Sequence, residues 1–349
     1  MTTIAEQQSH VTVGVDTHAD VNVAAVLDER GRLLATESFP TTSNGHRCLE
    51  RWALGFGAIE AIGVEGTGSW GAGIARHLSA QGHKVLEIDC PSRQTRYRRG
   101  KSDTIDAEAA ARAVLAGTAT STPKSRTGVV ESIRVLRIAR RSAVTERAST
   151  INRLHSVVST APDELRAKLR TLTVRQLVAT CASTRPGDLA DPIQATKFAL
   201  RSLARRHQHL SDEIAALDAQ LKPLVIAAAP PSLLARNGVG IDVAGQLLVT
   251  AGDNPDRLHS AAAFANLCGV APIPVASGHS STYRLNRGGD RAANAALYHV
   301  VIARLRWDPD TRAYIENYTK GGKTRNAAIR NLKHYIARQI YSDLRQLTP

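Results

Sequence analysis

Short apolar runs and helical stretches alternate over the first 120 residues in an order that few folds share. Three strand-like runs come first, and Asp28-Glu29-Arg30-Gly31 is a predicted hairpin turn between the second and the third. Two further strands follow, each reached through a helical stretch. The predicted strands cover residues 11–16, 21–28, 32–39, 58–66 and 84–89, and the predicted helices cover residues 44–55, 68–82 and 103–117.

This order of elements constrains how the strands pair. Hairpin connections make neighbouring strands antiparallel, whereas helical crossovers make them parallel. We therefore predict an α/β domain with a three-stranded meander and two parallel strands. Among common folds, that order fits a ribonuclease-H-like domain best. In this topology the first and fourth strands are neighbours.

The middle of the chain is predicted to be helical. Residues 120–127 have the Ser, Thr and Pro content of a linker, and residues 129–160 show helical periodicity. A second long helix begins after Asp191-Pro192, a predicted N-cap and first-turn proline. Its apolar positions follow heptad spacing from Leu200 to Leu221. This seam can close an intramolecular helical hairpin or join two protomers, and it is our candidate for a protomer contact.

The last third of the chain is predicted to be mainly helical. Two helices flank a tight Gly238-Val239-Gly240 turn, as in a helix-hairpin-helix element whose backbone N–H groups bind a phosphate. A plain packing turn fits this pattern equally well. A loop over 271–290 then leads to two amphipathic helices at 291–305 and 324–346. The chain accordingly divides into residues 1–120, 121–228 and 229–349.

The formal net charge of +14 is unevenly distributed along the chain. Residues 1–90 contain 6 basic and 11 acidic side chains, whereas residues 91–349 contain 39 basic and 20 acidic ones. A strongly basic remainder favours nucleic acid as the partner, because phosphate contacts by Lys and Arg release condensed counterions. The alternative is a surface made basic by an arginine-rich genome.

Several classes of protein are disfavoured by the sequence. No run approaches the roughly 18 uncharged apolar residues of a membrane span. The N-terminus, MTTIAEQQSH, lacks the basic start and apolar core of a secretory signal, so we expect a cytosolic protein. The cysteines form no C-x-x-C pair, which argues against a zinc knuckle or a disulfide framework. They are Cys48, Cys90, Cys181 and Cys268.

Four acids fall where predicted strands end or helices begin: Asp16, Glu65, Asp103 and Asp106. Asp16 and Glu65 would meet at one edge of the sheet, and the other two share one helix face because they are three residues apart. Clustered carboxylates repel one another unless a divalent cation lies between them, and oxygen-rich sites select Mg²⁺ or Mn²⁺. Taken singly, the helix acids are better explained as N-caps, but four acids on this topology favour a metal site.

A dinucleotide site is an alternative for the same region. Gly66-x-Gly68-x-x-Gly71 follows a strand, and Glu87 ends the next one, which meets the pattern of a dinucleotide-binding loop. That loop usually opens a doubly wound parallel sheet rather than following a meander. A sugar-kinase or actin fold also begins with an Asp-bearing hairpin, but it needs a second phosphate loop.

Five stretches together carry a resemblance over essentially the whole chain. They are VGVDTHADVNVAAV, VEGTGSWG, GKSDTIDAEAAARA, NGVGIDVAGQLLVTAGD and PVASGHSSTYRLNRGGDRAANAAL. In order and spacing they resemble the insertion-sequence transposases of the one-ten family, also called DEDD transposases. The resemblance implies a RuvC-like N-terminal domain, a helical spacer and a C-terminal transposase domain with a reactive serine. It also implies similarity to recombinases guided by a structured bridge RNA.

The resemblance assigns roles to particular residues. Asp16, Glu65, Asp103 and Asp106 would be the acid tetrad that binds the metal, and Ser277 would be the nucleophile. Ser280 and Ser281 are close enough to compete for that role. The residues that we expect to contact nucleic acid are those of a basic loop, the glycine turn and the segment after the serine. They are Arg93, Arg96, Arg98, Arg99, Lys101, Gly238, Gly240, Arg287 and Arg291.

These observations predict a metal-dependent DNA recombinase that moves an insertion sequence. Its partners would be donor DNA, target DNA, a guide RNA and further copies of the same chain. Since the acids and the serine lie in different domains, folding or assembly between protomers must bring them together. One alternative is a RuvC-like nuclease that uses water as its nucleophile. Another is a nucleic-acid-binding protein without catalytic activity.

Overall fold

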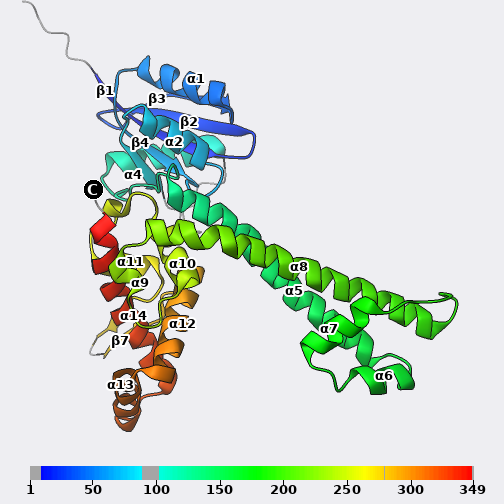
Figure 1. Ribbon diagram of the computed structural model, residues 1–349. Helices are drawn as coiled ribbons and strands as arrows, with labels where there is room; N and C mark the ends of the chain where they lie inside the picture. Colours follow the sequence, from blue (N-terminus) through cyan, green and yellow to red (C-terminus); the bar gives the residue numbers. More distant parts are fainter. Residues whose placement is uncertain (1–8, 89–101, 279, 348–349) are drawn as a thin grey trace, which may run out of the picture.

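The N-terminal part of the protein is a five-stranded mixed sheet. The computed structural model describes residues 9–88, 102–278 and 280–347. The strand order is β3-β2-β1-β4-β5 (Figure 1). The first three strands pair antiparallel, while β1 with β4 and β4 with β5 pair parallel, so the predicted pairing is confirmed. The strands are β1 (His10–Thr17), β2 (Val21–Asp28), β3 (Leu33–Pro40), β4 (Ala58–Glu65) and β5 (Val85–Ile88).

Helices cover both faces of this sheet. The helices α1 (Ser43–Leu54) and α2 (Ala72–Ala80) share a core with the side chains of alternate β1 residues. The helix α4 (Asp103–Leu115) lies on the opposite face, where Ala107 packs against β2. Because successive strand residues point to opposite faces, Asp16 is directed to the side of α4.

Gly14 allows α4 to approach β1 closely. A Cβ atom at this position would lie 2.1 Å from the carbonyl oxygen of Ala107 and 2.2 Å from the backbone nitrogen of Ala111. Backbone atoms cannot move aside as a flexible side chain can. We expect Gly14→Ala to lower the free energy of unfolding, measured by urea denaturation, by about 3 kcal/mol. Gly240→Ala is the control, since its Cβ would meet nothing within 4 Å, and an equal loss in both variants would contradict this account.

A long helical arm extends from the N-terminal sheet and the C-terminal helices. Two antiparallel helices, α5 (Val129–Ser159) and α8 (Pro192–Ala228), form the arm (Figure 1). Two shorter helices, α6 (Asp163–Leu169) and α7 (Val174–Ser183), pack at its far end. As predicted, Asp191 caps α8, because its carboxylate accepts a hydrogen bond from the backbone N–H of Ile193.

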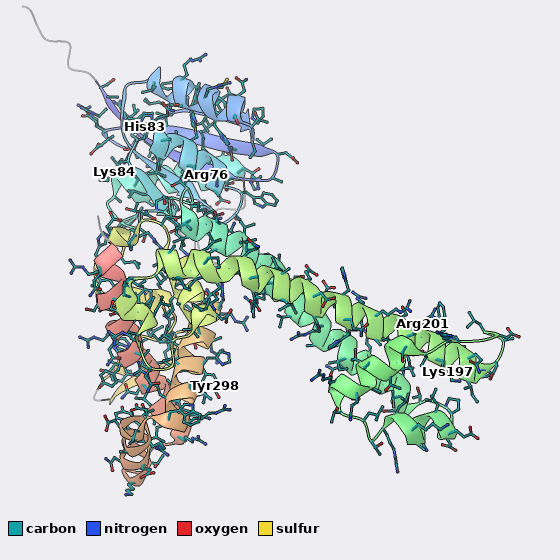
Figure 2. The ribbon with its side chains drawn as sticks, viewed as in Figure 1. Arg76, His83, Lys84, Lys197, Arg201 and Tyr298 are labelled. Carbon is teal, nitrogen blue, oxygen red and sulfur yellow. The ribbon has the colours of Figure 1, made fainter. Side chains whose placement is uncertain are left out.

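The heptad seam of α8 is filled within the chain. Leu200 packs with Leu154, and Leu210 and Ile214 pack with Ala143, so the buried positions of the seam face α5. The interpretation of this seam as a protomer contact is therefore wrong, and the intramolecular hairpin is correct. The outer surface of the arm carries basic side chains near its far end, such as Lys197 and Arg201 (Figure 2).

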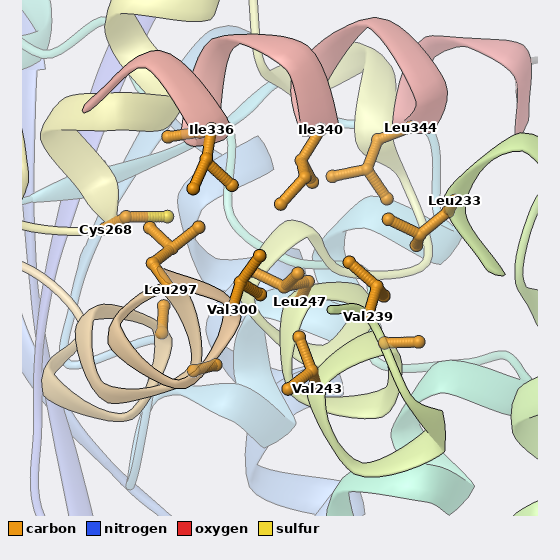
Figure 3. Close-up of a cluster of buried hydrophobic side chains, with 14 of the residues drawn as sticks. Leu233, Val239, Val243, Leu247, Cys268, Leu297, Val300, Ile336, Ile340 and Leu344 are labelled. Carbon is orange, nitrogen blue, oxygen red and sulfur yellow. The ribbon is translucent and has the colours of Figure 1, made fainter. Parts of the chain in front are cut away.

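The C-terminal part is a helical domain with one small hairpin. A single apolar core joins Leu247, Phe264, Leu297 and Ile340 from four different helices (Figure 3 shows part of it). Among the described residues, no helix is both long and apolar enough to span a membrane. The elements are α9 (Pro231–Leu234), α10 (Ile241–Ala251), α11 (Ala261–Leu267), β6 (Ile273–Ser277), β7 (Ser280–Arg284), α12 (Arg291–Trp307), α13 (Pro309–Lys320) and α14 (Arg325–Leu344).

One prediction for this domain is wrong, and one is incomplete. Residues 271–290 are not a continuous loop, because β6 and β7 pair antiparallel across a two-residue turn. The two helices predicted at 291–305 and 324–346 are confirmed as α12 and α14, and a further helix, α13, lies between them. Asp308 ends α12 and caps α13 by accepting a hydrogen bond from the backbone N–H of Thr311, so a single polar residue separates the two helices.

The predicted linker is bonded to both domains. The backbone N–H of Glu87 donates to the carbonyl of Ser121 (2.7 Å), and the guanidinium of Arg126 donates to the carbonyl of Gly68 (2.9 Å). On the other side, Lys124 Nζ donates to the carbonyl of Val249 (2.7 Å). Segment 120–127 therefore connects the N-terminal sheet and the C-terminal domain through specific hydrogen bonds.

Lys124 makes this junction sensitive to pH. Burial, aided by the positive charge of Arg257, lowers the pKa of Lys124 to about 8 from its ordinary value of 10.5. Between these pH values the unfolded chain binds a proton that the folded chain has lost, so stability increases as the pH rises. We expect the free energy of unfolding to gain about 3 kcal/mol relative to Lys124→Met over this window. A constant difference between the two proteins from pH 7.5 to 10 would contradict the lowered pKa.

Candidate metal centre

The carboxylates of the predicted tetrad converge at one edge of the N-terminal sheet. Asp16 and Glu65 lie at the ends of the adjacent parallel strands β1 and β4, where Val15 pairs with Val64. Asp103 and Asp106 occupy the first turn of α4. The side chains of Asp16 and Asp106 are buried, whereas Asp103 is exposed. All four residues thus lie where the topology predicted them, and their role as ligands stays a prediction.

The electrostatics of this edge are unfavourable without a counterion. Burial raises the pKa of Asp16, and the nearby carboxylates of Glu65 and Asp106 raise it further. His18 lowers the pKa of Asp16, both by its charge and by a hydrogen bond to the carboxylate. A positive charge placed among these carboxylates would stabilise the ionised form of the buried Asp16.

His18 belongs to this centre and was missed by sequence reasoning. Its Nε2 lies 3.1 Å from Asp16 Oδ2 and 3.4 Å from Asp103 Oδ1. One ligand atom from each of these three residues falls within 4.8 Å of the other two, which is close enough to hold one metal ion. The spacing Asp-x-His was the available signal, because His18 directly follows β1, and residues two apart in an extended chain lie on the same face.

The donor set suits a divalent cation. Carboxylate oxygens are the preferred ligands of Mg²⁺, and an imidazole nitrogen next to them is also compatible with Mn²⁺. Burial is the main cause of the raised pKa of Asp16, and the carboxylates of Glu65 and Asp106 add to it. The residues present therefore fit a divalent metal ion.

The glycine-rich stretch after β4 shapes the backbone behind Glu65. Gly66 has a φ of +68°, and a Cβ atom on Gly71 would lie 2.5 Å from the carbonyl oxygen of Glu65. The chain can therefore fold back sharply after Glu65 and enter α2. Glu87 accepts a hydrogen bond from the hydroxyl of Thr67, so its carboxylate braces this turn. The mixed sheet and this use of Glu87 disfavour the dinucleotide alternative.

The predicted serine lies in the other half of the molecule. Ser277 ends β6, is exposed and pairs in register with Ser280 across the turn that contains Gly278. The β6–β7 hairpin lies well apart from the sheet that carries the acids, with the C-terminal helices between them (Figure 1). Within one chain, the structure thus brings the acids together with one another but not with Ser277.

The other predicted nucleic-acid contacts have mixed outcomes. The basic loop lies outside the described residues: Arg93, Arg96, Arg98, Arg99 and Lys101. Arg287 and Arg291 line one cavity of about 560 Å³ in the C-terminal domain.

Gly238 has a φ of +83°, and its Cβ would lie 2.9 Å from the carbonyl of Val300, so packing explains this glycine. Gly240 caps α10 with open space beside it, and its contact with a phosphate stays a prediction.

Two family models match the two ends of the chain. A model described as a transposase, of the DEDD class of IS110, matches residues 13–162 and covers all four acids. A model described as a transposase of the IS116/IS110/IS902 family matches residues 232–316 and covers Ser277.

Two relatives extend this similarity to named insertion elements. An uncharacterized 43.6 kDa protein of insertion element IS110 from Streptomyces coelicolor is 32% identical over 149 residues, which are 42% of this chain and 36% of that protein. An uncharacterized 42 kDa protein of insertion element IS900 from Mycobacterium paratuberculosis is 27% identical over 114 residues, 32% of this chain and 29% of that protein. The matched regions thus span about a third of the length of these relatives.

Proposed function

Because the chain belongs to the IS110 family of transposases and carries matches to both of its domains in order, we propose that it cuts and rejoins DNA strands to move an insertion element. The observation that carries this proposal is the convergence of Asp16, Glu65, Asp103 and Asp106 at one sheet edge. The strand order β3-β2-β1-β4-β5 supports a ribonuclease-H-like, RuvC-like fold for this half.

The acids form the metal half of the proposed site. Asp16, Glu65, Asp103 and Asp106 would hold Mg²⁺, or Mn²⁺, and His18 lies within reach of the same position. When bound, such an ion polarises the scissile phosphate and stabilises the charge that develops on it. The turn after Glu65 and the buried position of Asp16 hold these carboxylates in place before substrate arrives.

Ser277 is the proposed nucleophile. Its Oγ attacks the phosphorus, a serine–phosphate bond forms, and the bond from phosphorus to a deoxyribose oxygen breaks. The hydroxyl proton of Ser277 is transferred to that leaving oxygen. The energy of the phosphodiester bond is retained in the linkage, so the reverse reaction with a new strand rejoins DNA without a high-energy cofactor.

The proposed site is completed by assembly. The hairpin that carries Ser277 lies apart from the acids in one chain (Figure 1), so we place the complete site between protomers. An acid centre without its serine would be inactive until several strands are held together, which suits recombination. The heptad seam of α8 is already occupied, so another surface must join the protomers.

Guidance by a structured RNA is the proposed source of target choice. The basic excess lies after residue 90, and positive side chains such as Lys197 and Arg201 extend to the end of the arm (Figure 2). If base pairing reads the target, the protein needs only contacts to the backbone of nucleic acid.

A covalent-linkage assay tests this proposal. Purified protein is incubated with Mg²⁺, the element's end DNA and its flanking RNA, and then denatured. Protein-linked DNA is the expected product, and omission of the RNA tests the guide. The second candidate function is a RuvC-like nuclease that uses water, which the distance of Ser277 from the acids favours; it would release nicked DNA without linkage.

A further inference from the structure

A second cavity opens at the base of the β6–β7 hairpin. Its volume is about 690 Å³, within the range of about 300–1,000 Å³ typical of small-molecule sites. It shares Asn286, Arg287, Asn294 and Lys333 with the cavity described above, so the two cavities adjoin. Its walls come from residues 269–272, from β7 and the residues after it, from α12, α13 and α14, and from the turn that contains Lys323. Nothing in the proposed strand transfer uses these walls beyond Arg287.

The lining of this cavity is positively charged. It contains five cationic side chains, Arg284, Arg287, Lys323, Arg330 and Lys333, and no carboxylate. None of them takes part in an ion pair among residues 9–88, 102–278 and 280–347. Burial lowers the pKa of Lys333, and the positive charge of the neighbouring Arg330 lowers it further. Such a cavity favours an anion.

Lys333 is held in position for that anion. Its Nζ donates to Asn294 Oδ1 (2.7 Å), and the amide nitrogen of Asn294 donates to the carbonyl of Gly269 (2.9 Å). The ammonium group has three N–H donors, and Asn294 accepts from one of them. The lining residue His334 adds a buried Nδ1 that has no hydrogen-bond partner in the described part of the chain.

Aromatic rings stand beside these charges. Tyr318 stacks on Tyr314 with ring centroids 5.7 Å apart, and Lys323 Nζ lies 5.0 Å from the centre of the Tyr318 ring. The hydroxyl of Tyr314 accepts a hydrogen bond from Asn331 (2.8 Å), which fixes the pair. Tyr283 lines the cavity from β7 and is 71% exposed. Aromatic faces next to cations bind unpaired bases, whereas phosphates of a duplex need only the cations.

We propose that this cavity binds one unpaired deoxynucleotide of the DNA strand that Ser277 attacks. The phosphate would be contacted by Lys333 and Arg330, and the base would stack on Tyr318. Tyr283 pairs with Pro274, three residues before Ser277, so the cavity lies about 10 Å along the hairpin from the serine. Holding a base out of the duplex there would fix the scissile phosphate relative to Ser277. This inference rests on the proposed function.

Binding measured without cleavage tests the cavity. Fluorescence anisotropy in EDTA compares a short single strand of DNA, its duplex and an RNA strand of the same sequence. We expect Tyr318→Leu to weaken single-strand binding about tenfold, and duplex binding less than about twofold, because stacking contributes on the order of 1–3 kcal/mol per base. Arg330→Gln should weaken single-strand binding and reduce its salt slope by about 0.7.

Control variants separate the cavity from folding and from chemistry. Tyr318→Phe keeps the ring and should retain affinity, and Arg338→Gln removes an exposed arginine of α14 that does not line the cavity. The proposal would be overturned if Tyr318→Leu bound single-stranded DNA as tightly as the unmodified chain, or if it lost equal affinity for single strand and duplex. It would also be overturned if RNA bound more tightly than DNA and its binding depended on the Tyr318 ring. Because the measurement is made in EDTA, its outcome is independent of strand transfer.

Discussion

Ser277→Ala is expected to abolish the covalent linkage between protein and DNA. The variant loses only the attacking oxygen, and Ser277 is exposed at a strand end, so the hairpin should keep its fold. We expect at least about a thousandfold less protein-linked DNA after denaturation, since a methyl group cannot form a bond to phosphorus. DNA binding, measured by anisotropy, should change less than about twofold.

Ser280→Ala is the matched control, because Ser280 pairs in register with Ser277. It should retain linkage, and so should Ser281→Ala. If linkage persists in Ser277→Ala and disappears in Ser280→Ala, the nucleophile has been assigned to the wrong serine. If all three variants release nicked DNA without linkage, a water nucleophile replaces the serine mechanism.

The N-terminal half was predictable because local pattern and topology agree there. The two hairpins dictate that β2 pairs with β1 and with β3, and the crossover from β4 to β5 fits their parallel pairing. That β4 pairs with β1 and not with β3 was expected from the ribonuclease-H-like topology, which the order of elements fits best. Once β1 and β4 are neighbours, Asp16 and Glu65 must lie close together. Their positions therefore required no knowledge of packing, only of which strand ends meet.

His18 shows where this reasoning stopped. The residue lies two positions after Asp16, a spacing that puts both side chains on one face of an extended chain, yet a lone histidine just after a strand is more often structural. Only the position of α4 brings Asp103 to within 3.4 Å of it. That third contact depends on how the helix packs over Gly14, which local pattern does not encode.

The errors in the C-terminal half have physical causes as well. Gly, Ser and Pro in residues 271–290 suggested a loop, but Pro274 is tolerated in an isolated two-stranded hairpin because every strand there is an edge. The apolar positions of α8 would show the same heptad spacing if the partner helix were α5 or a helix of another chain. Periodicity identifies a buried stripe and does not identify what buries it.

Asp16→Asn is expected to separate stability from activity. Burial and two neighbouring carboxylates raise the pKa of Asp16, so its charged form destabilises the fold at neutral pH in the absence of a cation. In the unfolded chain this carboxyl has its ordinary pKa of 3.8, which is lower than in the folded chain. The free energy of unfolding therefore falls as the pH rises through and above 3.8. A neutral amide of the same shape removes this destabilisation, and the midpoint of thermal unfolding in EDTA should stay equal or rise.

The same substitution should remove the response to metal and the reaction with it. Mg²⁺ should raise the unfolding midpoint of the unmodified chain, because an ion that binds only the folded state stabilises it, but not that of Asp16→Asn. Strand cleavage should fall at least about a thousandfold, since a metal ion contributes several kcal/mol to such a transition state. Glu60→Gln, an exposed acid on β4, is the control for lost charge. A variant that still cleaves DNA and still responds to Mg²⁺ would show that Asp16 does not bind the metal.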